Sequence, residues 1–232
     1  MTSRPTLVVP HRSRRDLLER LLRAVDGWPI VVVDDTDAGL DLDVPRVRLG
    51  GGQGFSRAVN AGLATVRTAS AIVINDDALP FDDCLDRLAA QGGLCGPILE
   101  GPEGVESMGI VVKPWGRVVN RIDEGPIDAL SGACLHLPAS ARFDEAFRHG
   151  FEDVELCLRL GGATLVTDAR CWHDGGATLG RTTAEAQQHA LAGQLRLFRG
   201  WRKAVVVGLH VAQVVREGGP MDRIGGIVRG MR

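Results

Sequence analysis

Residues 55–77, with the sequence FSRAVNAGLATVRTASAIVINDD, decide the class of fold. The first part, from Phe55 to Val66, has the pattern of a helix. Ala71 to Ile74 is an uninterrupted apolar run, and two carboxylates follow it within three residues. A helix that leads into a buried strand is half of a strand–helix–strand unit. This stretch therefore predicts an α/β fold in which a buried strand ends in polar residues.

The residues before this stretch repeat the same alternation. Leu7 to Val9 is a short apolar strand, and an apolar helical stripe runs from Leu17 to Val25. Ile30 to Val33 is a run of β-branched residues, which suits a parallel strand covered on both faces. A weaker strand is expected at Val47 to Leu49. Alternating strands and helices predict a mostly parallel central sheet flanked by helices.

The second half of the chain is less regular. We expect strands at 109–112, 129–137, around Leu165 and at 170–172, and a helix at 152–160. From Thr183 onward the pattern is helical, with Leu191, Leu195 and Phe198 on one face. The sequence thus predicts a core over residues 1–180 and a C-terminal helical tail over residues 181–232.

Composition limits the class of protein. The chain has 232 residues, 44% of them apolar, and a formal net charge of -2, which favours a globular protein and disfavours nucleic acid as a partner. The five cysteines lack C-x-x-C spacing, so we expect reduced, buried thiols rather than disulfides or zinc ligands. The longest apolar stretch, Ala204 to Val215, contains His210 and Gln213 and is short for a membrane span. We therefore expect a cytoplasmic protein.

Polar or glycine-rich segments follow four consecutive strands. In an open parallel sheet, ligands bind beyond the carboxyl ends of the strands. The four segments are Pro10-His11-Arg12, Asp34 to Asp37, Gly50 to Gly54, and Asn75-Asp76-Asp77. Each one alone is also compatible with an ordinary turn. Together they predict a nucleotide-binding edge.

The glycine-rich segment differs from a dinucleotide-binding fingerprint. Arg57 stands three residues after Gly54, where that fingerprint has glycine, so a Rossmann oxidoreductase is a poor match. Glycines let the backbone approach a ligand closely, and Arg57 suits a diphosphate. Asn60 lies one turn further along the same helix face. The alternative is a glycine-rich turn beside a surface arginine.

Three further groups of residues are candidates for chemistry. Asp76 and Asp77 offer the oxygen ligands that Mg²⁺ and Mn²⁺ prefer. Glu152 and Asp153 begin a helix, where they either complement the helix dipole or supply a general base. His173 precedes Asp174 and two glycines, and is either a structural histidine or a metal or phosphate contact.

Taken in order, these segments resemble glycosyltransferase family 2, in its rhamnosyltransferase-like branch. The matching segments are Val8 to Arg12, Val32 to Asp35, Gly54 to Gly62, Ile74 to Ala78, Ser131 to Cys134, Phe143 to Phe147, Glu152 to Arg159 and His173 to Gly176. The resemblance covers residues 6–180. It implies a GT-A fold, with the nucleotide-sugar half at about 1–100 and the acceptor and catalytic half at 101–180.

The resemblance also implies roles for single residues. Asp153 would be the catalytic base, with Glu152 beside it, and Asp77 and His173 would bind the metal. The nucleotide-sugar would contact a set formed by Pro10, His11, Arg12, Asp34, Asp35, Gly54, Arg57, Asn60, Asn75 and Asp76. The chain departs from the family at two positions. Asn75 replaces the first acidic residue of the D-x-D motif, and Asp76, to which we assign no role, stands where that branch often has proline.

The predicted activity is that of an inverting hexosyltransferase that uses Mn²⁺ or Mg²⁺. It would move a sugar from a nucleoside-diphosphate sugar to a hydroxyl of a saccharide, a lipid-linked acceptor or a small molecule. The alternatives are a non-catalytic sugar-nucleotide-binding module and a nucleotidyltransferase, although the latter usually has a glycine-rich loop after its first strand. The tail would pack on the core or on a second subunit of a homodimer. Alternatively, it would contact the inner face of the membrane through its arginines.

Overall fold

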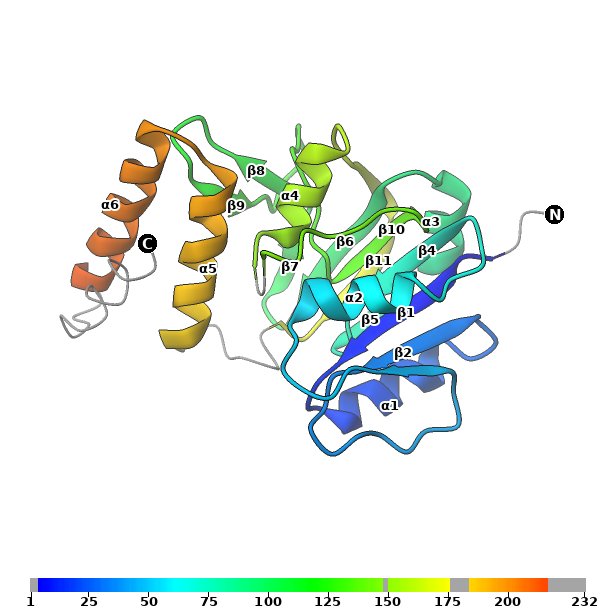
Figure 1. Ribbon diagram of the computed structural model, residues 1–232. Coiled ribbons are helices and arrows are strands. Elements are labelled where there is room, and N and C mark those ends of the chain that lie inside the picture. The colour runs from blue at the N-terminus through cyan, green and yellow to red at the C-terminus, as the bar shows by residue number, and fades with distance from the viewer. Residues whose placement is uncertain (1–3, 148–149, 176–183, 217–232) are drawn as a thin grey trace.

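A computed structural model describes residues 4–147, 150–175 and 184–216 (Figure 1). The helices are α1 Arg15–Ala24, α2 Phe55–Leu63, α3 Cys84–Gln91, α4 Glu152–Arg159, α5 Ala184–Leu197 and α6 Trp201–Arg216. The strands are β1 Thr6–His11, β2 Ile30–Asp34, β3 Arg46–Arg48, β4 Ser70–Ile74, β5 Ala78–Pro80, β6 Cys95–Gly101, β7 Gly104–Ser107, β8 Ile110–Val112, β9 Val118–Asn120, β10 Cys134–Pro138 and β11 Thr164–His173.

The central sheet has the strand order β3-β2-β1-β4-β10-β6-β11-β5, and β7 pairs with β6. The strands β3, β2, β1 and β4 are mutually parallel, as the sequence predicts. Beyond β4 the sheet is mixed, because β10 runs antiparallel to both β4 and β6, whereas β11 is parallel to β6. The antiparallel strand β10 therefore joins the parallel half to the second half.

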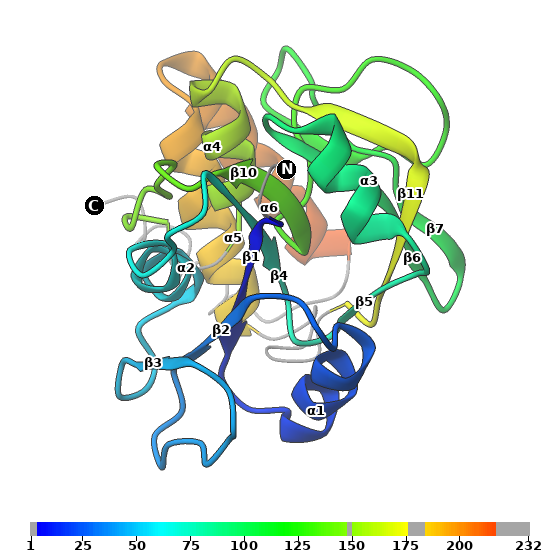
Figure 2. The same ribbon diagram turned by 90° about the vertical axis from the view of Figure 1, so that its right-hand side faces the viewer.

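Each face of the sheet has its own helices (Figure 2). Leu7 and Val9 of β1 point to the face that α1 and α3 cover, whereas Val8 points to the face that α2 and α4 cover. This alternation is expected because successive side chains of a strand point to opposite sides. The apolar runs in β1, β2 and β4 are therefore buried on both faces, which is the reason for their unbroken hydrophobic sequence.

Helix α2 lies unusually close to the sheet at Gly62. A Cβ atom at this position would lie 2.5 Å from a methyl group of Val8 and 2.8 Å from one of Val33. Only a residue without a side chain fits this contact, so Gly62 sets the distance between α2 and the strands.

The second half of the chain departs from the expectations in detail. The strand expected at 129–137 is shorter, and the two short strands expected near Leu165 and at 170–172 form one strand, β11, with an irregularity between Val166 and Arg170. Helix α3 and strand β6 were not expected. Their sequences are short, and β6 contains glycine and proline, which weaken a strand signal.

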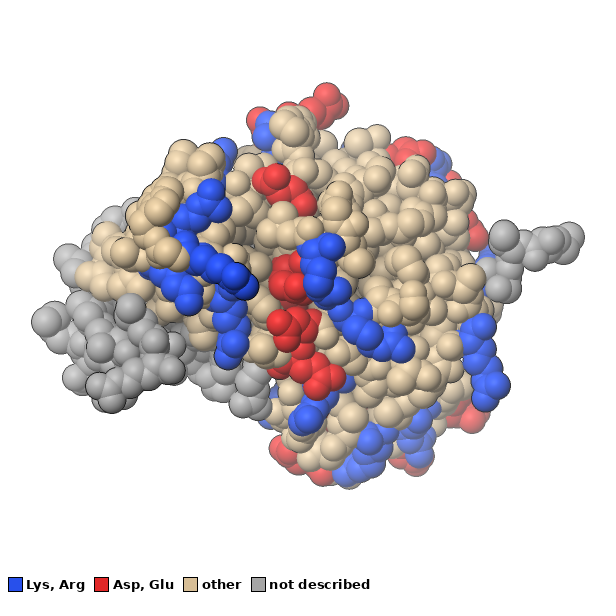
Figure 3. Space-filling view, turned by 45° about the horizontal axis from the view of Figure 1, so that its top comes forward, with Lys and Arg blue, Asp and Glu red and all other residues tan. Residues whose placement is uncertain are grey.

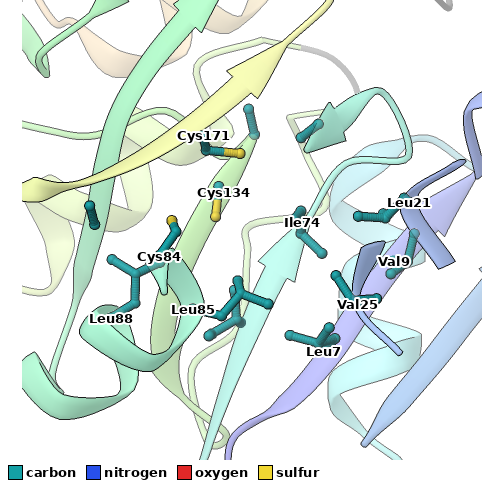
Figure 4. Packing of buried hydrophobic residues seen from close by; sticks show 14 of the residues in the cluster. Leu7, Val9, Leu21, Val25, Ile74, Cys84, Leu85, Leu88, Cys134 and Cys171 are labelled. Carbon is teal, nitrogen blue, oxygen red and sulfur yellow. The ribbon is translucent and has the colours of Figure 1, made fainter. Parts of the chain in front are cut away.

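All five cysteines are buried and none forms a disulfide, as expected. Cys84, Cys134 and Cys171 lie beside one another in the core below α3 (Figure 4). Burial raises the pKa of Cys95 to about 12. Cys95 is therefore a packing group of the core, since a thiol with such a pKa is a poor nucleophile.

The helical tail packs on the chain itself. Leu191, Leu195, Phe198 and Val206 form a separate apolar cluster, which contacts the hairpin of β8 and β9 through Val112 and other half-buried residues. The face predicted for the first tail helix is thus confirmed. Within the described part of the chain, no helix is long and apolar enough to cross a membrane. Residues 176–183 and 217–232, which include Gly176 and the end of the expected tail, lie outside the described residues.

Candidate functional site

The four strand ends predicted from the sequence contact one another. The carbonyl of His11, at the end of β1, accepts a hydrogen bond from the N–H of Asp35 over 2.9 Å. Nδ1 of His11 lies 2.5 Å from Oδ2 of Asp76, which follows β4. The glycine-rich segment joins them because Gln53 donates its N–H to the carboxylate of Asp35 over 2.9 Å. The polar edge predicted from the sequence is therefore one continuous site.

Asp77 and His173 come from segments almost a hundred residues apart and face each other. Strand β11 pairs with β5, and Asp174 donates its N–H to the carbonyl of Asp77 over 3.0 Å. Nε2 of His173 then lies 3.5 Å from Oδ1 of Asp77. Within the described part of the chain, this buried oxygen has no hydrogen-bond partner. The sequence named these two residues as metal ligands, and the fold brings them together.

Glu106 of β7 holds the other side of the His173 ring. Its Oε2 lies 2.9 Å from Nδ1 of His173, so the imidazole stands between two carboxylates. Burial opposes the charged form of His173, but the neighbouring carboxylates of Asp77 and Glu106 outweigh it and raise its pKa to about 9. Sequence reasoning missed Glu106, because β7 was not predicted and nothing around this residue marks it.

The arrangement of Asp77, His173 and Glu106 fits a divalent cation. A ligating imidazole commonly gives its second nitrogen to a carboxylate, which fixes the orientation of the ring. Asp77 supplies an oxygen that lacks a partner among the described residues, and His173 supplies a nitrogen. Across those residues, no group of three or more His, Cys, Asp or Glu side chains could hold a metal alone. The remaining coordination positions suit the oxygens of a diphosphate.

The acidic pair after β2 orders the neighbouring loops. Asp34 accepts hydrogen bonds from Thr36 and from the N–H of Leu40, and Arg48 lies 3.3 Å away. Burial would raise the pKa of Asp34, but these hydrogen bonds outweigh it and leave the pKa lowered. Asp35 is engaged with the N–H groups of the glycine-rich segment. Asp34 therefore orders the loop that follows β2, and Asp35 shapes the segment that follows β3.

The basic residues of this edge are half-exposed. Arg12 lies 3.9 Å from the carboxylate of Asp35, and its guanidinium is 3.3 Å from where a Cβ of Gly52 would lie. Arg57 donates to the side chain of Gln53 over 2.7 Å and lies 3.4 Å from Glu145. Two guanidinium groups thus flank the glycine-rich segment, whose glycines adopt positive φ angles.

Asn60 and Pro10 have different surroundings. The amide of Asn60 pairs with the backbone of Phe143 in both directions, each over 2.9 Å, and so ties α2 to the segment before α4. Pro10 is a half-buried residue of β1, paired with Val33. Both residues lie at the edge of the site, and the side-chain amide of Asn60 is hydrogen-bonded to the backbone of Phe143.

Beside Asp77, Asp76 is buried and Asn75 is half-buried. Burial raises the pKa of Asp76, although the contact with His11 opposes this shift. Asn75 donates its N–H to the carbonyl of Ala133 over 2.9 Å, and its Oδ1 is buried without a partner in the described residues. The His11–Asp76 pair gives Asp76 a structural partner that the sequence did not indicate.

The proposed base lies at the start of α4. Phe151, just before the helix, has a left-handed backbone with φ 70°, which costs a non-glycine residue about 1–3 kcal/mol. Such strain concentrates at functional sites. Asp153 accepts hydrogen bonds from the N–H groups of Gly132 over 2.9 Å and Val154 over 2.8 Å. Asp153 is therefore held in a fixed orientation by backbone donors.

Glu152 and Asp153 titrate differently. Burial and the neighbouring charge of Asp153 raise the pKa of Glu152 to about 8, and its Oε2 has no hydrogen-bond partner among the described residues. Burial also raises the pKa of Asp153, but its two backbone N–H donors stabilise the anion. The backbone donors thus favour the anion on Asp153, whereas Glu152, whose Oε2 lacks such a donor among the described residues, favours the protonated form.

No protein-family model and no curated protein sequence matches this chain. Several solved structures do match this chain. The mannosyltransferase PcManGT from Pyrobaculum calidifontis, in complex with GDP-Man and Mn²⁺, aligns with a TM-score of 0.60 at 14% identity, over 100% of this chain and 80% of that chain. Two TarS structures from S. aureus align at 14% identity with TM-scores of 0.54 and 0.56, over 90% and 100% of this chain but 69% and 55% of theirs.

These alignments agree with the topology described above. The sheet of the described residues has a parallel half that is joined to the second half through the antiparallel strand β10, and the alignment with PcManGT covers 100% of this chain. The chain has the GT-A fold of glycosyltransferases. The fold expected from the sequence is thus confirmed.

Proposed function

We propose that the protein is an inverting glycosyltransferase that uses a nucleoside-diphosphate sugar and a divalent cation. One observation carries the proposal. Gly132 binds the carboxylate of Asp153, and the next residue, Ala133, binds the backbone of Asn75, two residues from Asp77. The residue proposed as base and the strand end proposed to hold the cation are thus linked through two adjacent residues, which supports a role for both in sugar transfer from a diphosphate.

Asp153 is proposed as the general base. Its anion is held by backbone N–H donors, so it is fixed in orientation and ready to accept a proton from the acceptor hydroxyl. The resulting oxygen attacks the anomeric carbon on the face opposite the leaving diphosphate. A single displacement of this kind inverts the anomeric configuration. Burial and the neighbouring charge of Asp153 raise the pKa of Glu152, which disfavours a second negative charge beside the base.

Asp77 and His173 are proposed to hold Mn²⁺ or Mg²⁺, with Glu106 orienting the imidazole. When bound, such a cation offsets the negative charge on a departing diphosphate. Arg12 and Arg57 lie beside the glycine-rich segment and are proposed to contact the same diphosphate. The PcManGT structure, which contains GDP-Man and Mn²⁺, supports this pairing of donor and cation. The nucleotide base would lie near Asp35.

A thermal-shift screen tests this proposal. The diphosphates of uridine, guanosine, thymidine, adenosine and cytidine are each added with and without Mn²⁺. Binding to the folded state raises the melting temperature by mass action. We expect a shift with one diphosphate that requires Mn²⁺. No shift with any of the five would contradict the proposal.

The second candidate is a sugar-nucleotide-binding protein without catalysis. The feature that argues against it is the carboxylate of Asp153, held by two backbone donors, which the binding of a sugar nucleotide alone would not require. Release of free nucleoside diphosphate from a nucleotide-sugar, lost on substitution of Asp153, separates the two candidates.

A further inference from the structure

Two turns that are far apart in the sequence meet at one end of the molecule. Residues 113–117 connect β8 to β9, and residues 198–200 connect α5 to α6. Gln194 of α5 donates its side-chain amide to the carbonyl of Gly116 over 2.6 Å. A Cβ atom at Gly116 would lie 3.0 Å from a methyl group of Val206 in α6. The two turns therefore form one continuous surface, which we name the double-turn surface.

The double-turn surface exposes two tryptophans. Trp115 is 47% exposed in the first turn, and Trp201 is 63% exposed at the start of α6. The other tryptophans, Trp28 and Trp172, are half-buried. Exposing so much apolar ring to water is unfavourable unless something covers it. Tryptophan is also the side chain that concentrates where lipid headgroups meet hydrocarbon.

Unpaired positive charge surrounds these tryptophans. The cations are Lys113, Arg117, Arg196, Arg199, Arg202 and Lys203. Within the described residues none of them forms an ion pair, whereas Arg14, Arg87 and Arg159 elsewhere each pair with a carboxylate. The sequence contains no Asp or Glu between residues 186 and 216. Figure 3 shows Lys and Arg side chains gathered over the side that the tail helices form, with acidic side chains toward the middle.

Helix α6 continues the apolar part of this surface. Val206 is fully buried against α5 and the hairpin, but the opposite side of the helix faces outward. The exposed uncharged residues of α6 are Trp201, Ala204, Gly208, Leu209 and Ala212, and the exposed cations Arg202 and Lys203 lie in its first turn. An apolar stripe with cations at its edge is the pattern of a helix that lies in a membrane interface.

We propose that the double-turn surface binds the surface of an anionic lipid bilayer. The cations would meet the headgroups, and Trp115, Trp201 and the outward stripe of α6 would enter the boundary with the acyl chains. The unpaired cations favour an anionic lipid over a second copy of this chain, which would bring like charges together. The apolar stripe favours a bilayer over a nucleic acid, which offers phosphates but no hydrocarbon. None of these residues belongs to the site of the proposed function, so the two proposals can fail separately.

Vesicle co-sedimentation of the full chain tests the charge component. Vesicles of phosphatidylcholine are compared with vesicles that also contain phosphatidylglycerol. We expect binding to the second kind only, and weaker binding at high salt. A variant with Arg202→Glu and Lys203→Glu should bind about 30-fold more weakly or worse, given the attraction of each cation near such a surface. The matched control, Arg23→Glu with Arg67→Glu, changes the net charge equally at exposed positions elsewhere and should bind like wild type.

Tryptophan fluorescence tests the apolar component without a charge variant. Brominated lipid in the phosphatidylglycerol vesicles should quench wild-type emission, and Trp115→Phe with Trp201→Phe should abolish most of the quenching. Equal binding by the charge variant and its control, or no quenching of the wild type, would overturn the proposal. If the protein bound a heparin column but no vesicles, the proposal would also be overturned, and a nucleic acid would be the favoured partner. If the protein dimerised through Trp115 and Trp201 and bound no vesicles, the proposal would be overturned, and the partner of this surface would be a second copy of the chain.

Discussion

Gly132 donates its N–H to Asp153 over 2.9 Å, immediately before Ala133 accepts a hydrogen bond from Asn75. The backbone of this short segment, rather than a chain of side chains, therefore links the proposed base to the strand end that carries Asp77. It follows that side-chain substitutions should separate the two halves of the site. Loss of the base should leave donor binding intact, and loss of a metal ligand should impair donor binding itself.

Asp153→Asn should reduce turnover by roughly 10²–10⁴-fold, the usual contribution of a positioned general base. Asparagine keeps an oxygen that can accept from Gly132, so the fold should persist. The measurement is the rate at which nucleoside diphosphate is released from the nucleotide-sugar, with donor affinity determined in parallel. Unchanged turnover would remove Asp153 from the role of base.

Glu152 should make stability depend on pH. Its pKa rises from an ordinary value of 4.5 to about 8 in the folded state. The folded state therefore holds this proton more tightly, and the resulting stabilisation is complete below the unfolded pKa. It is lost as the pH rises through the folded pKa. The melting temperature of wild type, relative to Glu152→Gln, should thus fall as the pH is raised over this window.

The exposed Glu103 supplies the control for this pH dependence. Glu103→Gln removes the same charge from a solvated position, so its melting temperature should follow that of wild type at each pH. A difference between wild type and Glu152→Gln that stays constant with pH would show that Glu152 is not protonated in the folded protein.

Glu106→Ala should weaken Mn²⁺ binding by about 10–100-fold, the usual effect of losing a carboxylate that orients a ligating histidine. Glu106→Gln retains an acceptor for the imidazole N–H and should restore part of the affinity. The measurement is Mn²⁺ affinity by electron paramagnetic resonance, with and without nucleoside diphosphate. If the contact between Glu106 and His173 had only a structural role, Glu106→Ala and Glu106→Gln would both lower the melting temperature, and the Mn²⁺ affinity would stay the same.

Gly62→Ala should destabilise the fold by about 1–3 kcal/mol, the usual cost of overpacking a core. The added methyl group would collide with Val8 and Val33, which lie in the buried strands. Gly208 is the matched control, since it is a helical glycine with open space around its Cβ position. Gly208→Ala should stabilise the chain by up to about 1 kcal/mol. Chemical denaturation measures the free energy of unfolding of both variants. Equal changes in the two variants would refute the packing role of Gly62.

Much of the parallel half could be predicted from sequence because its signals are local. An apolar run with a polar residue directly after it defines both a buried strand and the end that faces the ligand, as at Ile74 and Asn75. The register of β1 against β2 then places His11 opposite Asp34 without further information. This explains why the positions of Asp35 and Asp77 after buried strands could be predicted.

The features that could not be predicted depend on contacts between segments that are far apart in the sequence. Glu106 reaches His173 only because β7 folds back on β6, and β6 pairs with β11. Asn60 matches the motif of a donor-binding residue, yet its amide pairs with Phe143, 83 residues away. The meeting of Trp115 with Trp201 at one surface depends in the same way on how the tail packs. No local pattern encodes such pairings.

The most direct test of the account is a titration of the nucleoside diphosphate chosen by the thermal-shift screen, with and without Mn²⁺. Wild type, Asp77→Ala, His173→Ala and Asp153→Asn are compared by calorimetry. The account predicts Mn²⁺-dependent binding in wild type and Asp153→Asn, and its loss in the other two variants. Binding of equal strength in all four proteins, with or without Mn²⁺, would contradict it.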